Sequence, residues 1–393
     1  MEYMDPKKHT LYANNATTSW PKPSGVAQAM VDSLAFQGSA GRGGGQGSLD
    51  AEHAVEHTRE RCAQFLGVSN IENLMFVPSA THGLNMVLQG YLKPGDAAIV
   101  ARAEHNSVLR PLHALQKRGV ELAWVPMAPG GYIDLAELEE LLKIGIDQGR
   151  PFKTVICRHG SNASGALQPI EDVVLLADQY GATAISDGAQ VAGHVPVSLE
   201  RLKVDAWVCS GHKGLLGPKG VGLMYLAPRF DLDITVWGGT GYGDADYLCE
   251  DHLRPTCYES GTEPLPAICG LDAGVKWLQE HPQAAEYTQE LGTELRARLI
   301  EIPTIRVLGP RADTPHLPLV PFVCEHIPTA VFGARLEKEY GIICRTGMHC
   351  APDAAKVLGV YPEGSVRLSL GPFNTAQDVD YLVEAVSALA ASA

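Results

Sequence analysis

Lys213 lies in a glycine-rich turn between two apolar segments, and this arrangement restricts the possible folds more than any other stretch. Segments 205–209 (DAWVC) and 221–226 (VGLMYL) have the character of buried strands, and SGHKGLLGPKG connects them. Lysine is rarely buried, because removing its ammonium group from water is costly. A desolvated lysine has a lowered pKa, and its neutral amine can react with an aldehyde. Lys213 is therefore either a reactive amine or, as is more common for a lone lysine, a solvated loop residue.

The composition indicates a large α/β enzyme. The chain has 393 residues, of which 45% are hydrophobic, enough for two domains or one large and one smaller domain. A net charge of -14 disfavours a surface for nucleic acid or anionic membranes, and no apolar stretch is long enough to span a bilayer. The N-terminus lacks an apolar signal region, and the nine cysteines form no C-x-x-C pair. We therefore expect a cytoplasmic protein with reduced thiols and no metal site.

Apolar segments alternate with amphipathic segments along residues 74–226. This alternation predicts a mostly parallel sheet with helices on both faces. Beyond residue 270 the pattern changes to longer helices and strands of more antiparallel character, which predicts a smaller α+β domain. We expect a large α/β domain over 25–270 and a small domain formed by 1–24 together with 271–393.

Polar residues follow the predicted strands of the large domain. The carboxyl ends of parallel strands lie on one edge of a sheet, where open α/β sheets bind ligands. Each residue alone has an ordinary explanation as a helix cap or loop residue, but together they predict a single crevice. They are Ser79-Ala80-Thr81, His105, Asn162, Asp187 with Gln190, and Ser210-His212-Lys213.

Three of these features suit pyridoxal phosphate (PLP), an aldehyde cofactor. The turn before the helix at Thr81 offers free N–H groups for a phosphate, although an ordinary βα turn looks the same. His105 could stack on a flat ring, or simply cap the next helix. Asp187 ends an apolar strand and needs a cationic partner, which a protonated pyridine nitrogen would supply. With these neighbours, Lys213 is predicted to bind PLP.

The chain resembles PLP enzymes of the class V aminotransferase group, and within it the cysteine desulfurase and selenocysteine lyase family. The matching segments are NNATTSWPKP, AEHNSVLRP, SNASG, SDGAQVAGH, SGHKGLLGPKGVG, ESGT, RTGMHCAP and SVRLSLGPFNT. The resemblance covers nearly the whole chain and implies a fold-type-I PLP-dependent transferase that forms a homodimer. RTGMHCAP resembles the group with a short, ordered cysteine loop, whose members often rely on a sulfur-accepting partner protein.

The resemblance implies a role for each strand-end residue. Lys213 would form the Schiff base with PLP and move the Cα proton of the substrate. His105 would stack on the ring, and Asp187 would pair with the ring nitrogen. The other implied cofactor contacts are Asn162 and Gln190 near the phenolic oxygen, Ala80, Thr81, Ser210 and His212 at the phosphate, and Thr262 reaching the phosphate of the other subunit's site.

The resemblance also implies how sulfur would be removed. The thiolate of Cys350 would attack the sulfur of L-cysteine, leaving a persulfide on Cys350 and releasing alanine, whereas a buried thiol there would be inert. Arg345 and His349 would help to stabilise the thiolate. Arg367 would bind the substrate carboxylate with a bidentate guanidinium, and Asn15 and Arg345 are predicted as further substrate contacts.

The chain departs from the family pattern near its N-terminus. The family usually has Asp-Asn-Ala-Ala-Thr, and this chain has Asn14-Asn15-Ala16-Thr17-Thr18. Ala80 also replaces a frequent threonine, and Glu263-Pro264 replace an apolar residue and an asparagine. These changes leave the substrate open. The predicted function is a cysteine desulfurase, and the alternatives are a selenocysteine lyase, another class V C–S lyase or aminotransferase acting on a different amino acid, and a non-catalytic scaffold.

Overall fold

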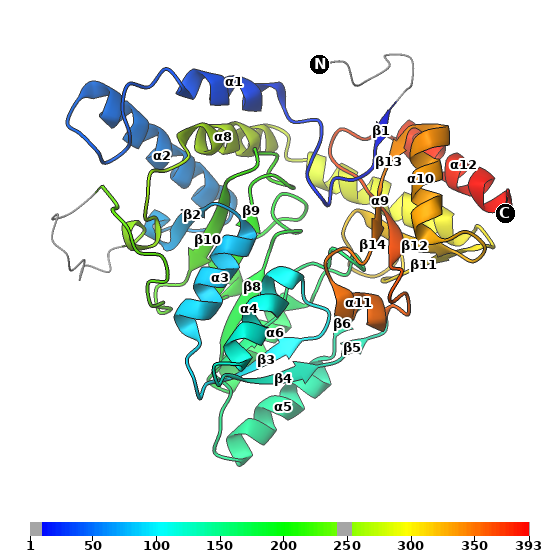
Figure 1. Cartoon of the computed structure of the whole chain (residues 1–393), viewed down its shortest axis with the longest axis horizontal. Helices are drawn as coiled ribbons and strands as arrows, with labels where there is room; N and C mark the ends of the chain where they lie inside the picture. Colours follow the sequence, from blue (N-terminus) through cyan, green and yellow to red (C-terminus); the bar gives the residue numbers. More distant parts are fainter. Residues whose placement is uncertain (1–9, 242–253, 393) are drawn as a thin grey trace.

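The structure is a computed structural model that describes residues 10–241 and 254–392, so that residues 1–9 of the predicted small domain lie outside it (Figure 1). A large sheet has the strand order β2-β10-β9-β8-β7-β3-β4. Its strands run parallel except β10, which is antiparallel to both β2 and β9. The predicted mostly parallel sheet is therefore confirmed. The strands are β2 (Leu74–Val77), β3 (Ala97–Ala101), β4 (Glu121–Val125), β7 (Thr154–Ile156), β8 (Thr183–Asp187), β9 (Ala206–Ser210) and β10 (Gly222–Leu226).

Helices connect and cover these strands. The helix α3 packs against β9 and β10, α6 packs against β7 and β8, and α8 packs against α1 and α2. The helical segments are α1 (Ser24–Ser33), α2 (Gln46–Phe65), η1 (Ile71–Asn73), α3 (Ala80–Tyr91), α4 (Asn106–Gln116), α5 (Leu135–Asp147), α6 (Ile170–Gln179), α7 (Leu199–Leu202), η2 (Thr256–Tyr258) and α8 (Leu265–Glu280). A small hairpin joins β5 (Met127–Ala128) to β6 (Tyr132–Ile133). None of the helices within the described ranges is both long and apolar enough to cross a bilayer.

The packing of α3 brings its first turn to the edge of the sheet. Leu84, Val87 and Leu88 form its apolar face and are fully buried. Gly83 lies one turn into the helix, and a Cβ atom added there would come within 2.7 Å of Cγ1 of Val208 on β9. The missing side chain thus lets the helix begin directly above the sheet.

A second sheet, with the order β11-β12-β15-β14, lies in the C-terminal part of the chain and is antiparallel. The N-terminal strand β1 pairs in parallel with β13 beside it (Figure 1). The strands are β1 (Leu11–Tyr12), β11 (Ile305–Val307), β12 (Leu319–Cys324), β13 (Ile342–Ile343), β14 (Arg345–Gly347) and β15 (Ser365–Ser369). The helices are α9 (Ala284–Ile300), α10 (Thr329–Tyr340), α11 (Pro352–Val357) and α12 (Ala376–Ala391).

Two hydrophobic cores accompany the two sheets. Leu11 packs with Leu295 and Val366 around the second sheet, whereas the core of the first sheet extends to Leu278 near the end of α8. Burial of apolar surface is the main favourable term in folding, so each core holds its own sheet together. The core of the first sheet thus includes residues of α8 beyond residue 270.

Candidate active site

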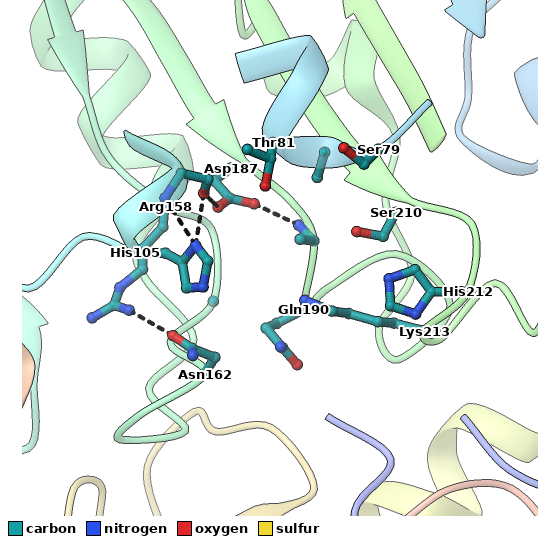
Figure 2. Close-up of a pocket in the computed structure, with 14 residues that line it drawn as sticks. Ser79, Thr81, His105, Arg158, Asn162, Asp187, Gln190, Ser210, His212 and Lys213 are labelled. Atoms are coloured by element: carbon teal, nitrogen blue, oxygen red, sulfur yellow. Dashed lines mark hydrogen bonds between the residues drawn. The ribbon is translucent and has the colours of Figure 1, made fainter. Parts of the chain in front are cut away.

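A cavity of about 130 Å³ lies at the carboxyl ends of the parallel strands (Figure 2). All predicted cofactor contacts except Thr262 line it. The lining residues are Ser79, Ala80, Thr81, His105, Ser107, Arg158, Gly160, Asn162, Asp187, Ala189, Gln190, Ser210, His212 and Lys213. The fold thus brings together residues that are spread over more than a hundred positions of the sequence, because each follows a strand of one sheet.

One wall of the cavity is the N-terminus of α3. Ser79 caps the helix, and its Oγ accepts a hydrogen bond from the N–H of His82 at 3.2 Å. N–H groups in the first turn of a helix have no partner within the helix and attract anions. The ring of His212 lies across from this helix, and its buried Nδ1 has no hydrogen-bond partner in residues 10–241 and 254–392. These groups fit a phosphate.

Asp187 and His105 form the central part of the site. The carboxylate of Asp187 accepts hydrogen bonds from the N–H of Ala189 at 2.9 Å and from Oγ of Ser107 at 3.4 Å. His105 caps α4, and its Nδ1 accepts a hydrogen bond from the N–H of Ser107 at 3.1 Å. Burial lowers the pKa of His105 to about 4, although Asp187 opposes the shift. His105 is therefore neutral at pH 7, which suits an imidazole that stacks on a flat ring.

Lys213 occupies the turn after β9. The next residue, Gly214, lies so close to another segment that an added Cβ would be 2.2 Å from the carbonyl oxygen of Ala192. This close packing explains the glycine after the lysine. Burial lowers the pKa of Lys213 to about 8; Asp187 opposes this shift, and Arg367 adds to it. The geometry fits the predicted role, since a desolvated amine is a nucleophile and a base near neutral pH.

Arg367, on β15, is fully buried beside the cavity residues. Its Nη1 donates to the carbonyl oxygen of Asn162 at 2.8 Å, and its Nη2 donates to Oγ1 of Thr17 at 2.9 Å and, at 3.5 Å, to Oδ1 of Asn14. Its Nε has no partner, and no ion pair forms with it in the described parts of the chain. Burial, reinforced by Arg345, lowers its pKa to about 9. A guanidinium without an acidic partner fits the predicted carboxylate site.

The side chain of Asn15 hydrogen-bonds to the protein itself, which was not expected for a substrate contact. Its Nδ2 donates to the carbonyl oxygen of Ser369 at 3.2 Å and to Oδ1 of Asn374 at 3.4 Å, and its Oδ1 accepts from the N–H of Trp20. These bonds tie the N-terminal segment to β15 and occupy the amide. The neighbours that contact Arg367 are Asn14 and Thr17, the first and last residues of a turn closed by a hydrogen bond from the N–H of Thr17 to the carbonyl oxygen of Asn14 at 3.0 Å.

Cys350 lies in the turn between β14 and α11, and its side chain is exposed. The Nη2 of Arg345 lies 3.1 Å from its Sγ, so Arg345 contacts the thiol as predicted for thiolate stabilisation. His349 is buried, and its Nε2 hydrogen-bonds with Oγ of Ser365 at 2.9 Å rather than with the thiol. Burial also lowers the pKa of His349 well below its usual value, so it contributes no positive charge.

Thr262 lies away from the cavity of its own chain. It is exposed and lines a separate depression with His82 and Met86 of α3. A contribution to a phosphate site would therefore need a second copy of the chain.

Several residues of the site were missed in the sequence. Ser107 follows His105 in the first turn of α4, where a serine was easily taken for a cap. Arg158 follows β7 just as Asp187 ends β8, and the same rule about charged residues at strand ends would have identified it. Asn14 and Thr17 were recognised as departures from the family pattern, but only the folded chain shows that both contact Arg367.

Comparisons with known proteins agree with this geometry. The sequence profile of the family "Aminotransferase class-V" matches residues 11–382. A protein of Mycolicibacterium paratuberculosis named "Probable cysteine desulfurase" is 32% identical over 98% of this chain, which spans only 56% of that protein. A protein of Vibrio cholerae with the same name is 30% identical over 96% of this chain and 92% of its own length. The apo structure of a cysteine desulfurase from Thermococcus onnurineus NA1 superposes with a TM-score of 0.89, at 28% identity, over 98% of this chain and 95% of that one. This likeness confirms the predicted fold-type-I architecture.

Proposed function

The chain belongs to the aminotransferase class-V family, and we propose that it is a PLP-dependent cysteine desulfurase. It would convert L-cysteine into L-alanine and a persulfide on Cys350. The observation that carries this proposal is the pairing of an exposed thiol with Arg345 beside a cavity that holds a desolvated lysine, Lys213. Several relatives bear the name cysteine desulfurase, whereas no contact within residues 10–241 and 254–392 favours a selenocysteine lyase.

The residues of the cavity fit PLP. Lys213 would hold its aldehyde carbon, Asp187 its ring nitrogen and His105 its ring face, with the phosphate at the N-terminus of α3 beside Ser210 and His212. When bound, the cofactor supplies an electron sink for the carbanion formed at the substrate Cα. The family is PLP-dependent, which agrees with this donor set.

The protein groups divide the chemistry between them. Arg367 binds the α-carboxylate and so orients the Cα–H bond toward Lys213, whose neutral amine takes the proton. The Cys350 thiolate, next to Arg345, then attacks the substrate sulfur. A bond forms between the two sulfur atoms as the carbon–sulfur bond breaks, and the electrons of that bond remain on the carbon, which is protonated to give alanine. The persulfide stays on Cys350.

The proposal extends to partners and location. A homodimer would let Thr262 reach the phosphate site of the partner copy. In support of this, Thr262 does not line the cavity of its own chain but a separate depression. The exposed position of Cys350 would let a sulfur-accepting protein collect the persulfide. We place the enzyme in the cytoplasm, in keeping with the cysteines of the described residues, which form no disulfide.

A product assay tests the proposed function. The purified enzyme with PLP and a thiol reductant should release alanine and sulfide in equal amounts from L-cysteine. Selenocysteine and cysteine sulfinate serve as comparison substrates. Preference for one of these, or the absence of alanine from cysteine, would contradict the proposal.

The pKa of Lys213 leads to a prediction about cofactor loading. Only the neutral amine attacks the aldehyde, so the loading rate of the cofactor-free protein should rise with pH up to about 8 and then level off. A solvated lysine would instead require a rise to about pH 10.4. The growth of visible absorbance after PLP addition, followed from pH 6.5 to 10, measures this. A rate that still increases above pH 9 would show that Lys213 is not desolvated.

A further inference from the structure

Arg158 is a buried cation whose guanidinium hydrogen-bonds with no carboxylate of the described residues. Only 3% of the surface of Arg158 is exposed, and its guanidinium forms no ion pair in residues 10–241 and 254–392. Glu104 lies next to it but accepts only the main-chain N–H of Arg158, at 2.8 Å. Burial raises the pKa of Glu104 although the charge of Arg158 opposes the shift, and burial lowers the pKa of Arg158 although the charges of Glu104 and Asp187 oppose that shift. Burying a guanidinium without a direct ion pair is costly, and this cost points to a function for Arg158.

The guanidinium of Arg158 points to Asn162 (Figure 2). Its Nη1 donates to Oδ1 of Asn162 at 3.2 Å. The two ends of an amide side chain have nearly the same shape, and their orientation is decided by hydrogen-bond partners. A cationic donor at one end requires oxygen there and directs the NH₂ group to the other end. Arg158 therefore decides which way the amide of Asn162 faces.

The NH₂ group of Asn162 holds the loop that carries Cys350. Its Nδ2 donates to the carbonyl oxygen of His349 at 2.5 Å. With the amide reversed, two oxygen atoms would face each other. A second bond, from the N–H of Asn106 to the carbonyl oxygen of Cys350 at 2.9 Å, holds the next peptide group. Residues of the large domain thus hydrogen-bond to the peptide groups on both sides of Cys350.

This loop needs such support. His349 and Cys350 have φ angles of 52° and 58°, in the left-handed region that is unfavourable for residues with a side chain. Conformations of this kind persist when surrounding contacts hold them. In this conformation Sγ of Cys350 lies next to Arg345, and the main chain of Asn162 also accepts a hydrogen bond from Arg367. Asn162 thus joins the thiol loop to the carboxylate site.

We propose that Arg158 is a positioning residue for sulfur transfer. Through Asn162 it holds residues 348–351 in the conformation that presents Cys350 to the substrate sulfur. The effect on sulfur transfer rests on the proposed function, but the effect on the loop does not.

Hydrogen exchange on the PLP-loaded enzyme tests the loop directly. Arg158→Met removes the donor and keeps an unbranched chain, and Arg158→Lys keeps a cationic donor. In the Met variant the protected amides of Asn106 and Ala351 should exchange about tenfold faster, as expected for the loss of one charge-assisted hydrogen bond. The Lys variant should restore most of the protection. Peptides of α12 should be unchanged, which excludes general destabilisation.

Asn162→Ala provides a second route should Arg158→Met fold poorly. It removes the relay and should speed exchange in the same peptides. Adding Arg158→Met to it should cause no further increase, because both act through one hydrogen-bond chain. Additive effects, or unchanged exchange in either single variant, would overturn the proposal.

The kinetic consequence separates this proposal from the proposed function. Arg158→Met should lower kcat for L-cysteine by about tenfold to a hundredfold, as expected for a misplaced reacting group, and leave KM within about threefold. The rate of persulfide formation on Cys350, measured by mass spectrometry, should fall by the same factor as kcat. The visible absorbance of the bound cofactor should not change. If the wild-type enzyme makes no alanine from cysteine, the proposed function fails, and the exchange experiment still decides the role of Arg158. A drop in cofactor absorbance without faster exchange would show that Arg158 binds cofactor instead.

Discussion

Lys213→Ala should abolish the covalent attachment of PLP and lower cysteine turnover by at least about a thousandfold, because the variant loses the amine that holds the cofactor and moves the proton. No second lysine lines the cavity within the described chain, so none can take its place. Borohydride reduction followed by peptide mass spectrometry measures the attachment. The wild-type protein should carry the reduced cofactor on the peptide that contains Lys213, and the variant should carry none.

Lys219 offers a matched control for this experiment. It lies in the same turn but is exposed, so Lys219→Ala should keep both the attachment and the visible absorbance. Attachment of the cofactor to another lysine in the Lys213→Ala protein would show that the reactive amine was assigned wrongly.

Cys350→Ala should lower alanine formation from L-cysteine by about a hundredfold or more, in the range seen when a group that acts directly in the chemical step is removed. The physical reason is that a persulfide needs a nucleophilic sulfur, and Arg345 contacts this one. The visible absorbance of the bound cofactor should persist, and so should the change in this absorbance when cysteine binds, since Cys350 does not line the cofactor cavity. Alanine release and the mass of the Cys350 peptide after one turnover are the two measurements.

Cys344→Ala is the control for the thiol. Burial raises the pKa of Cys344 to about 12, so this thiol stays protonated near neutral pH and its removal should leave turnover unchanged. Selenocysteine provides a further test, because its cleavage can proceed without a cysteine nucleophile. Equal loss on both substrates would mean that Cys350 supports the fold of the site, and no loss on cysteine would disprove the persulfide mechanism.

The residues that line the cavity were largely predictable, because their positions depend on local pattern and sheet geometry. Asp187, His105 and Lys213 each follow an apolar strand, and parallel strands end on one edge of the sheet. A charged residue at such a position needs a partner wherever the remaining chain lies. Sequence order alone therefore places these side chains around one cavity.

The contacts of the N-terminal segment were not predictable in the same way. Asn14, Asn15 and Thr17 are neighbours in the sequence, and which of them faces Arg367 depends on the register of the segment against β15. The segment turns at these residues, with the N–H of Thr17 bonded to the carbonyl oxygen of Asn14, and this turn sets Asn14 and Thr17 side by side. Asn15 stays a prediction as a substrate contact, and the sequence alone did not single out Asn14 and Thr17, the two residues of this segment that hydrogen-bond with Arg367.

By itself, the sequence determined the α/β fold class and most of the residues that line the cavity, since hydrophobic periodicity and strand-end polarity are local properties that survive in any α/β packing, and the family resemblance implied the cofactor contacts. Only the tertiary structure decided how the sulfur end of the site is assembled. Arg158, Asn162, Cys350 and Arg367 come from both sheets, and they meet because the two parts of the chain pack together. The direction of one amide, set by a buried arginine, leaves no periodic trace in the sequence, because a single hydrogen bond fixes it.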